Sequence, residues 1–244
     1  MHALILAGGE GSRLRSDGVS TPKAFVELAG QPLLLRLGGS LRGLGCESVT
    51  ALVRGSALDR AGPQLSLDAS DAMRVVACET PSSLHTLARG LETVPPGPVL
   101  CALVDTVMRD ADWQELFVRG DQQLRRGADA CVVVTPFVDD EKPLYVARHP
   151  AGTVAAFQET PSVPALVTGG VYFLSSRIRS LVPRVLELGI VRMRGFLRWL
   201  VEHGYRIGTW EVARIVDLDR GRDLALASAW LSPEDGAGRG RRRA

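Results

Sequence analysis

The feature that most constrains the fold of this 244-residue chain is the alternation of short apolar runs with helical patterns. Apolar runs typical of buried strands stand at residues 2–7, 47–54, 73–78, 98–104 and 129–137. Leu-rich helical patterns separate them at 32–45, after 54, at 82–94 and at 112–127. Parallel strands need such long return connections. The alternation therefore predicts a doubly wound, three-layer α/β fold with right-handed crossovers.

The second half changes character before the alternation resumes. Residues 144–159 and 165–176 are β-rich with turns, which predicts an insertion of antiparallel strands on the same sheet. Helices are expected at 177–189, 194–204 and 220–231, with strands at 205–212 and 214–218. Without a long linker or an internal repeat, we expect one domain over residues 1–232.

The small net charge of +2 depends on the end of the chain, where four of the last six residues are arginine. Removing those four charges leaves −2 for the rest. Residues 233–244 are expected to form a disordered basic tail. Aromatic, Gln or Asn readers do not accompany the arginines, so nucleic acid is not an expected partner.

Cysteine usage and hydropathy indicate the compartment. Cys46, Cys78, Cys101 and Cys131 are far apart, without a CxxC pair, and three of them stand in apolar runs. Buried free thiols in a reducing cytosol fit this pattern better than a zinc site or a disulfide framework. Because the chain starts without a basic leader and has no apolar run near eighteen residues, we expect a cytoplasmic protein without membrane partners.

Residues 7–23, AGGEGSRLRSDGVSTPK, follow the first predicted strand. Ligands of open α/β sheets bind past the carboxyl ends of the strands. Glycines let the backbone come close to a ligand, and consecutive N–H groups make an anion nest. Arg13 and Lys23 add positive charge at the same place. The stretch is therefore a candidate triphosphate cradle.

Simpler interpretations of this loop exist. A glycine turn with surface basic residues is one of them. A dinucleotide fingerprint starting at Gly9 would need glycine at position 14, which is Leu14, and the chain has no Gly-Lys-Ser/Thr P-loop. The loop alone is weak evidence, whereas the full pattern LAGGxGxRL, seven residues, PKAF and then GQPLL is much more specific.

Residues 4–33 resemble the signature of the sugar-1-phosphate nucleotidyltransferases, the NDP-sugar pyrophosphorylase type. The resemblance implies a Rossmann-like α/β/α fold with a mostly parallel mixed sheet and a small β-rich acceptor-binding insertion. It also implies a Mg²⁺-dependent enzyme that joins a nucleoside triphosphate to a sugar 1-phosphate and releases pyrophosphate.

The resemblance assigns roles to the glycine loop. The nucleotide would lie against Leu6, Ala7, Gly8, Gly9, Gly11, Ser12 and Arg13. Lys23 would reach the α-phosphate or the sugar phosphate, and Arg13 would neutralise the leaving pyrophosphate.

Asp105 follows the apolar run PVLCALV, where the ligand should lie. An Asx-turn or helix cap is the plain alternative. The family has its metal-binding, nucleotide-contacting Asp at this place, although the preceding residue is usually Gly and here is Val104. The second metal ligand is Asp217 by likeness to the sugar-nucleotide members, or Asp219 by likeness to the acidic-sugar branch. Asp223 is expected on the helix surface or at the helix dipole.

The acceptor side is implied by residues 155–176. Glu159 matches the carboxylate that binds sugar hydroxyls, and Thr168, Gly169 and Gly170 match the backbone that approaches the ring. Thr160 stands where a phosphate-binding Lys is usual, and Thr168 stands where Asn is frequent. Lys23, or else Arg148 or Arg192, would then have to supply the missing positive charge.

Two further segments carry open alternatives. Pro81, Ser82 and Ser83 either present groups to a base edge or begin a helix as its cap. Asp139 and Glu141 belong either to a solvated hairpin or to the mouth of the acceptor site, where they would bias the acceptor charge.

Two alternatives to a sugar-phosphate enzyme remain. The acceptor is another phosphorylated alcohol or cofactor, or the chain is a non-catalytic nucleotide-binding relative.

Overall fold

The computed structural model describes residues 1–61, 73–139 and 141–231. The predicted tail at 233–244 lies outside this range, as does part of the Leu-rich segment after the second strand. None of the helices in the described part is long and apolar enough to cross a membrane.

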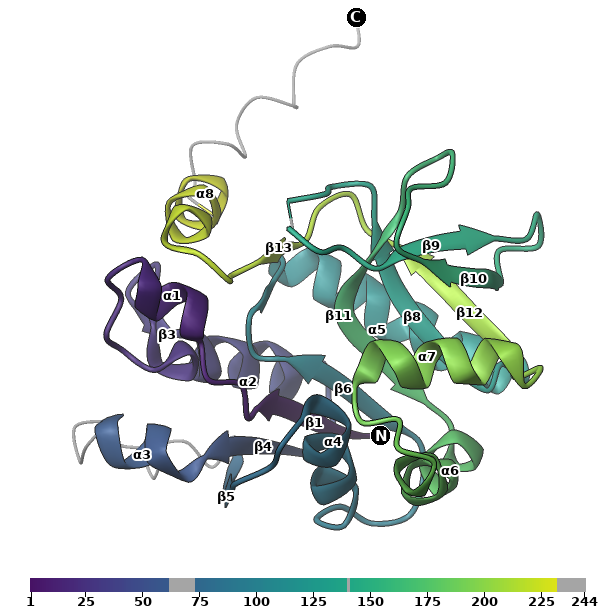
Figure 1. The fold of residues 1–244 in the computed structure, drawn as a ribbon, viewed down its shortest axis with the longest axis horizontal. Coiled ribbons are helices and arrows are strands. Elements are labelled where there is room, and N and C mark those ends of the chain that lie inside the picture. The colour runs from purple at the N-terminus through teal and green to yellow at the C-terminus, as the bar shows by residue number, and fades with distance from the viewer. Residues whose placement is uncertain (62–72, 140, 232–244) are drawn as a thin grey trace, which may run out of the picture.

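One mixed sheet of nine strands runs through the described residues (Figure 1). Its parallel strands are β1 (His2–Ala7), β4 (Ser48–Arg54), β5 (Arg74–Cys78), β6 (Val99–Leu103), β8 (Ala130–Thr135) and β12 (Ile207–Glu211). They follow the order β5–β4–β1–β6, then β8–β12 beyond one intervening strand. The predicted strand–helix alternation and mostly parallel pairing are confirmed.

The inserted strands are antiparallel. β11 (Val167–Leu174) lies between β6 and β8 and runs against both. β9 (Tyr145–Arg148) pairs with the start of β11, and β10 (Val154–Gln158) pairs with β9. The predicted β-rich insertion on the same sheet is confirmed.

Helices cover both faces of the sheet. One face packs against α1 (Ser12–Ser16), α2 (Leu33–Gly43), α3 (Gly55–Ala61), α5 (Asp110–Arg125) and α8 (Gly221–Leu231). The other packs against α4 (Ser83–Leu91), α6 (Ser176–Glu187) and α7 (Met193–Glu202), which are in front of the sheet in Figure 1. Alternate side chains of β1 supply both cores, Ala3 and Ile5 on the first face and Leu4 and Leu6 on the second, as the period of a strand requires.

Short elements stand outside the main sheet. A 3₁₀ turn, Lys23–Phe25, precedes the small hairpin of β2 (Glu27–Leu28) and β3 (Gln31–Pro32). The segment predicted as a strand at 214–218 contributes only β13 (Val216–Asp217), which pairs with β7 (Thr106–Val107) rather than joining the main sheet. This pairing brings the last strand of the described residues to the turn that follows β6.

Candidate active site

A pocket of about 420 Å³ opens at the carboxyl ends of β1 and β6. Open α/β sheets bind ligands at this place. The pocket is lined by Leu6, Gly8, Gly9, Gly11, Ser12, Arg13, Lys23, Ser83, Leu103, Val104, Asp105 and Asp219. Most residues predicted to contact nucleotide or metal therefore meet in one cavity, while Ala7, Pro81, Ser82 and Asp217 lie outside its lining.

The space around the three glycines of the loop differs, and so does the structural reason for a glycine at each position. Gly11 precedes α1 in the left-handed conformation, with φ of 60°, and a Cβ there would lie 3.1 Å from Cβ of Lys23. A Cβ on Gly8 would lie 2.9 Å from Oγ1 of Thr86. At Gly9 a Cβ would meet no described atom within 4 Å. Gly8 and Gly11 thus allow close packing within the protein, and Gly9 leaves open space at the loop.

Arg54 holds this loop, a role that sequence reasoning missed. Its Nε donates a hydrogen bond to the Gly8 carbonyl (3.2 Å), and its Nη1 pairs with Glu79 (3.3 Å). The available sign was its position: Arg54 ends β4 at the carboxyl edge of the sheet, where ligand-site residues are expected.

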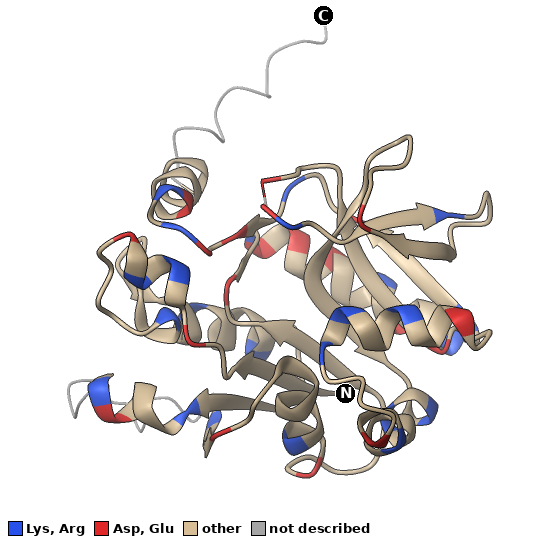
Figure 2. Ribbon diagram, viewed as in Figure 1, with Lys and Arg blue, Asp and Glu red and all other residues tan. Residues whose placement is uncertain are grey.

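Three carboxylates converge beside the loop. Oxygens of Asp105, Asp217 and Asp219 all lie within 4.8 Å of one another. The β13–β7 pairing explains this, because Asp217 is opposite Thr106 and the Leu218 N–H donates to the Asp105 carbonyl (3.1 Å). Figure 2 shows the acidic segments after β6 and around β13 facing the basic side of α1. Val104, which precedes Asp105 where glycine is usual in the family, does not prevent the carboxylates from converging. Its side chain is buried, and its N–H donates a hydrogen bond to the Leu6 carbonyl (3.2 Å).

Lys23 and Arg13 neutralise part of this negative charge. Lys23 Nζ donates to Asp105 and to Asp219, and Arg13 Nη1 donates to the other oxygen of Asp219 (2.5 Å). Burial alone would lower the pKa of Lys23, but the three carboxylates outweigh it and raise that pKa. Burial would likewise raise the pKa of Asp219, but Lys23 and Arg13 hold it below the ordinary value.

The third carboxylate is not compensated in the same way. Burial, followed by repulsion from Asp105, raises the pKa of Asp217 well above its ordinary value. Oδ1 of Asp105 and Oδ1 of Asp217 are buried without a hydrogen-bond partner. Buried oxygens of this kind cost free energy unless a donor or a cation reaches them. The set of carboxylates therefore fits a hard divalent cation such as Mg²⁺.

Asp223 hydrogen-bonds to the backbone next to the three carboxylates. It is 3% exposed, so the expected surface position is wrong, and it stands in the first turn of α8, which was the alternative. Its Oδ2 accepts hydrogen bonds from the backbone N–H groups of Asp219 (2.9 Å) and Arg220 (2.6 Å). It thereby fixes the backbone that carries Asp219.

Of the residues expected to bind the acceptor, Thr168 and Gly169 line a small recess that also contains Asp217. The pairing of β11 with β8 is irregular between Thr168 and Tyr172, as in a β-bulge. A Cβ on Gly169 would lie 2.0 Å from Cδ1 of Ile215, and one on Gly170, whose φ is 74°, would lie 2.4 Å from Oγ1 of Thr106. These glycines let β11 pack closely against the segments of β13 and β7.

Glu159 is outside both cavities. Its carboxylate pairs with Arg198 of α7 and lies 3.8 Å from Arg194. Of the cations expected to replace the usual Lys, Arg148 pairs with Glu211 (3.0 Å), and Arg192 is an exposed residue just before α7. Among these candidates, only Lys23 lines the nucleotide pocket.

The segment proposed to read the base is tied to the start of α7. Ser82 precedes α4 in an extended conformation; its hydroxyl donates to the Val191 carbonyl and lies 2.8 Å from Nδ1 of His85, but it accepts no hydrogen bond from a backbone N–H of the helix. Ser83 Oγ accepts the Met193 N–H (3.0 Å). Ser82 therefore begins α4 by position without capping it through its side chain, and Ser83 is the member of this segment that reaches the pocket.

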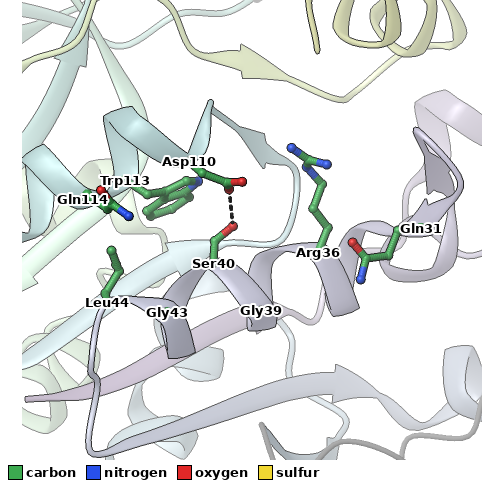
Figure 3. A pocket seen from close by; sticks show the side chains of 9 residues that line it. All are labelled: Gln31, Arg36, Gly39, Ser40, Gly43, Leu44, Asp110, Trp113 and Gln114. Carbon is green, nitrogen blue, oxygen red and sulfur yellow. Dashed lines mark hydrogen bonds between the residues drawn. The ribbon is translucent and has the colours of Figure 1, made fainter. Parts of the chain in front are cut away.

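A separate cavity, of about 360 Å³, lies between α2 and the start of α5 (Figure 3). Ser40 donates a hydrogen bond to Asp110 across it (3.0 Å), and Arg36 extends along its wall. It shares no lining residue with the cavity at the carboxyl ends of the strands. The predicted site residues all lie elsewhere, so the chemistry described above belongs to the first cavity.

Comparison with known proteins agrees with this geometry. Residues 3–176 match the family model described as the MobA-like NTP transferase domain. The chain is 29% identical over 196 residues to the mannose-1-phosphate guanylyltransferase catalytic subunit beta of Drosophila pseudoobscura pseudoobscura, covering 76% of this chain and 49% of that protein. It is 27% identical over 241 residues to the CMP-5'-(3-aminopropyl)phosphonate synthase of Streptomyces rubellomurinus, covering 89% of this chain and 36% of that protein.

The chain thus spans half or less of the length of these two curated relatives. Among solved structures, it is similar to a Bacillus anthracis protein assigned as a glucose-1-phosphate thymidylyltransferase. The TM-score is 0.78 at 17% identity, over 94% of this chain and 95% of that one. At this identity the likeness establishes the fold.

Proposed function

The chain belongs to the family of MobA-like NTP transferase domains, and we propose that it transfers a nucleoside monophosphate from a nucleoside triphosphate to a sugar 1-phosphate. The products would be an NDP-sugar and pyrophosphate. The observation that carries the proposal is the placement of the glycine loop, Lys23 and Arg13 directly opposite the three converging carboxylates. The basic loop and the carboxylates together favour the joint binding of a triphosphate and a divalent cation.

In the proposed reaction, an oxygen of the acceptor phosphate attacks the α-phosphorus in line. The bond from that phosphorus to the bridging oxygen breaks, and pyrophosphate leaves with the electron pair. Lys23 orients the attacking and α-phosphate oxygens, while Arg13 and the N–H groups of the loop neutralise the charge on the leaving group. No side chain needs to form a covalent bond in such a transfer.

We propose that Asp105, Asp217 and Asp219 hold Mg²⁺, which would offset negative charge on the triphosphate. Both aspartates of the open alternative, Asp217 and Asp219, lie close enough to Asp105 to take part. Asp223 keeps the Asp219 backbone in place. A cytoplasmic location, where nucleoside triphosphates are abundant, belongs to the same proposal.

A second acceptor class has a specific observation in its favour. The relative that covers 89% of this chain is named for a phosphonate rather than for a sugar 1-phosphate. A phosphonate offers the same attacking oxygens to the α-phosphorus. The transfer chemistry would be unchanged, and only the pocket beyond the phosphate would differ.

The test is pyrophosphate release in the presence of Mg²⁺, with the common triphosphates screened against sugar 1-phosphates, other phosphate monoesters and phosphonates. Asp105→Asn should lower the rate by about 10²–10³-fold, because a preorganised charge at the reacting phosphates is lost. Asp59→Asn, an exposed aspartate on α3, is the matched control and should keep full activity. Nucleotide binding without pyrophosphate release from any acceptor would instead support a non-catalytic relative.

A further inference from the structure

The glycine loop is held by an arginine that lies outside the nucleotide pocket. Resting on the proposed function, we infer that Arg54 is a positioning residue for nucleotide binding. It fixes the peptide between Gly8 and Gly9 in the one orientation that directs the Gly9 N–H toward the nucleotide. Two observations carry this inference, the contacts at the two ends of the peptide and the order of the strands.

The two ends of the Gly8–Gly9 peptide differ in their contacts. The Gly8 carbonyl accepts a hydrogen bond from Nε of Arg54 (3.2 Å). The Gly9 N–H, in contrast, donates to no acceptor in the described part of the chain. Gly9 nevertheless lines the nucleotide pocket, whereas Arg54 does not. The protein thus binds the carbonyl from outside the pocket and leaves the N–H available to a ligand.

The order of the strands places these two ends on opposite sides of β1. Arg54 ends β4, which pairs with one edge of β1, while β6 pairs with the other edge (Figure 1). The pocket includes residues 103–105 at the end of β6. The C=O and N–H of a trans peptide point in opposite directions because the unit is planar. A Gly8 carbonyl that faces Arg54 therefore directs the Gly9 N–H toward the pocket.

The flanking glycines make this peptide easy to rotate when Arg54 does not hold it. Gly9 has no positive φ in the structure. Rotating the peptide by half a turn would give Gly9 a positive φ, which glycine adopts without strain. The rotated peptide would direct the Gly8 carbonyl into the pocket, where its partial negative charge would repel a triphosphate. The hydrogen bond from Arg54 selects against this orientation.

Arg54 is itself held in place by two acidic side chains. Its Nη1 pairs with Glu79, which follows β5, and lies 3.6 Å from Glu10 of the loop. The other carboxylate oxygen of Glu79 accepts the Ser56 N–H (3.3 Å). The guanidinium therefore joins the glycine loop to the ends of β4 and β5. A lysine has one nitrogen in place of three and can replace only part of these contacts.

Calorimetry with Mg²⁺ and the triphosphate that binds most tightly tests this role. In Arg54→Met, about one molecule in ten should keep the binding orientation, so Kd for the triphosphate should rise about 10-fold. Because saturating nucleotide restores the orientation, kcat should stay within about twofold of the wild type. Arg54→Lys should recover part of the affinity. Arg60→Met removes an exposed arginine of α3 and is the matched control, which should change neither value.

A double-mutant cycle with Gly9→Ala tests the peptide orientation itself. A Cβ at position 9 would meet no described atom within 4 Å, and it disfavours the positive φ of the rotated peptide. Once alanine restricts the peptide, Arg54→Met should raise Kd by less than about threefold. The same rise in both backgrounds would overturn the inference.

NMR of protein labelled with ¹⁵N-glycine gives a readout that needs neither nucleotide nor the Gly9→Ala variant. The Gly9 amide signal should be shifted, broadened or doubled in Arg54→Met, unchanged in Arg60→Met, and restored by saturating nucleotide. An unchanged Gly9 signal or an unchanged Kd in Arg54→Met would overturn the inference. A lower kcat with unaltered KM, the result of a smaller folded fraction, would also overturn it. Absence of pyrophosphate release with every acceptor would count against the proposed function alone, because the binding and NMR measurements do not depend on transfer.

Discussion

At the scale of single residues, Lys23 is the most informative side chain. It is the cation that three nearby carboxylates share, and burial strengthens these interactions because water is excluded. A divalent cation entering the same carboxylates would compete with its ammonium. Triphosphate oxygens, by contrast, would draw Lys23 and Arg13 away from Asp219. Metal and nucleotide should therefore assist each other's binding.

Lys23→Met should bind Mg²⁺ more tightly than the wild type when nucleotide is absent, by about tenfold or more, because the competing charge is gone. Titration calorimetry of the nucleotide-free proteins measures this directly. Arg125→Ala, an exposed residue on α5, serves as the control for general loss of positive charge. Equal or weaker Mg²⁺ binding by Lys23→Met would show that Lys23 does not compete with the metal.

Asp217→Asn should make the metal-free protein more stable at neutral pH, by roughly 1 kcal/mol, because it removes a half-buried carboxylate that repels Asp105 and whose Oδ1 is buried without a hydrogen-bond partner. Urea unfolding with a chelator present gives this difference. Added Mg²⁺ should then stabilise the wild type much more than the variant. A less stable variant in the chelator would contradict the assigned repulsion.

At the scale of elements, the site depends on β13 lying across the end of the main sheet. Asp217 reaches Asp105 because this two-residue strand pairs with β7. The glycines of β11 make room for that crossing, since Ile215 occupies the space where a side chain at position 169 would be. Position 169 thus requires glycine because β11 packs closely against the segment that contains Ile215.

Gly169→Ala should destabilise the protein by about 1–3 kcal/mol through overpacking and should also lower activity, because the Ile215 segment carries Asp217. Adding Ile215→Val removes the Cδ1 atom that a new Cβ would meet. The double variant should therefore lose less stability than the two single losses combined, a coupling that denaturant unfolding of all four proteins measures. Strict additivity would rule out this contact as the reason for the glycine.

At the scale of the whole molecule, the sequence predicted much of the fold because its signs are local. Buried strands read as continuous apolar runs, and the chain alternates them with helices of sufficient length. The position of Asp105 followed from the same pattern, since it comes directly after a buried strand.

Interactions between distant segments were not predictable in this way. Arg54 contacts Gly8, and Arg198 contacts Glu159, although the partners of each pair are far apart in the sequence. No spacing rule predicts such contacts. Asp223 looked like a surface charge because helix starts favour acidic residues, whereas its burial depends on the packing of α8. The meeting of Asp217 and Asp219 with Asp105 came from family resemblance, and the β13–β7 pairing supplies its physical cause.

Removing residues 236–244 should leave nucleotide transfer unchanged, because every side chain assigned to the site lies within residues 1–231. Steady-state kinetics of the shortened chain and of the 244-residue chain test this. Binding to heparin or DNA, measured alongside, shows whether the four terminal arginines contribute to polyanion binding. A large loss of transfer on truncation would mean that the tail takes part in the site.

The central claim is that this chain joins a nucleoside monophosphate to a phosphorylated acceptor, and ³¹P NMR of the reaction mixture tests it most directly. The account predicts that the triphosphate signals are replaced by pyrophosphate and by a new P–O–P linked product in equal amounts, only when Mg²⁺ and acceptor are both present. Pyrophosphate with free nucleoside monophosphate, or nucleoside diphosphate with inorganic phosphate, would show hydrolysis instead and would contradict the account.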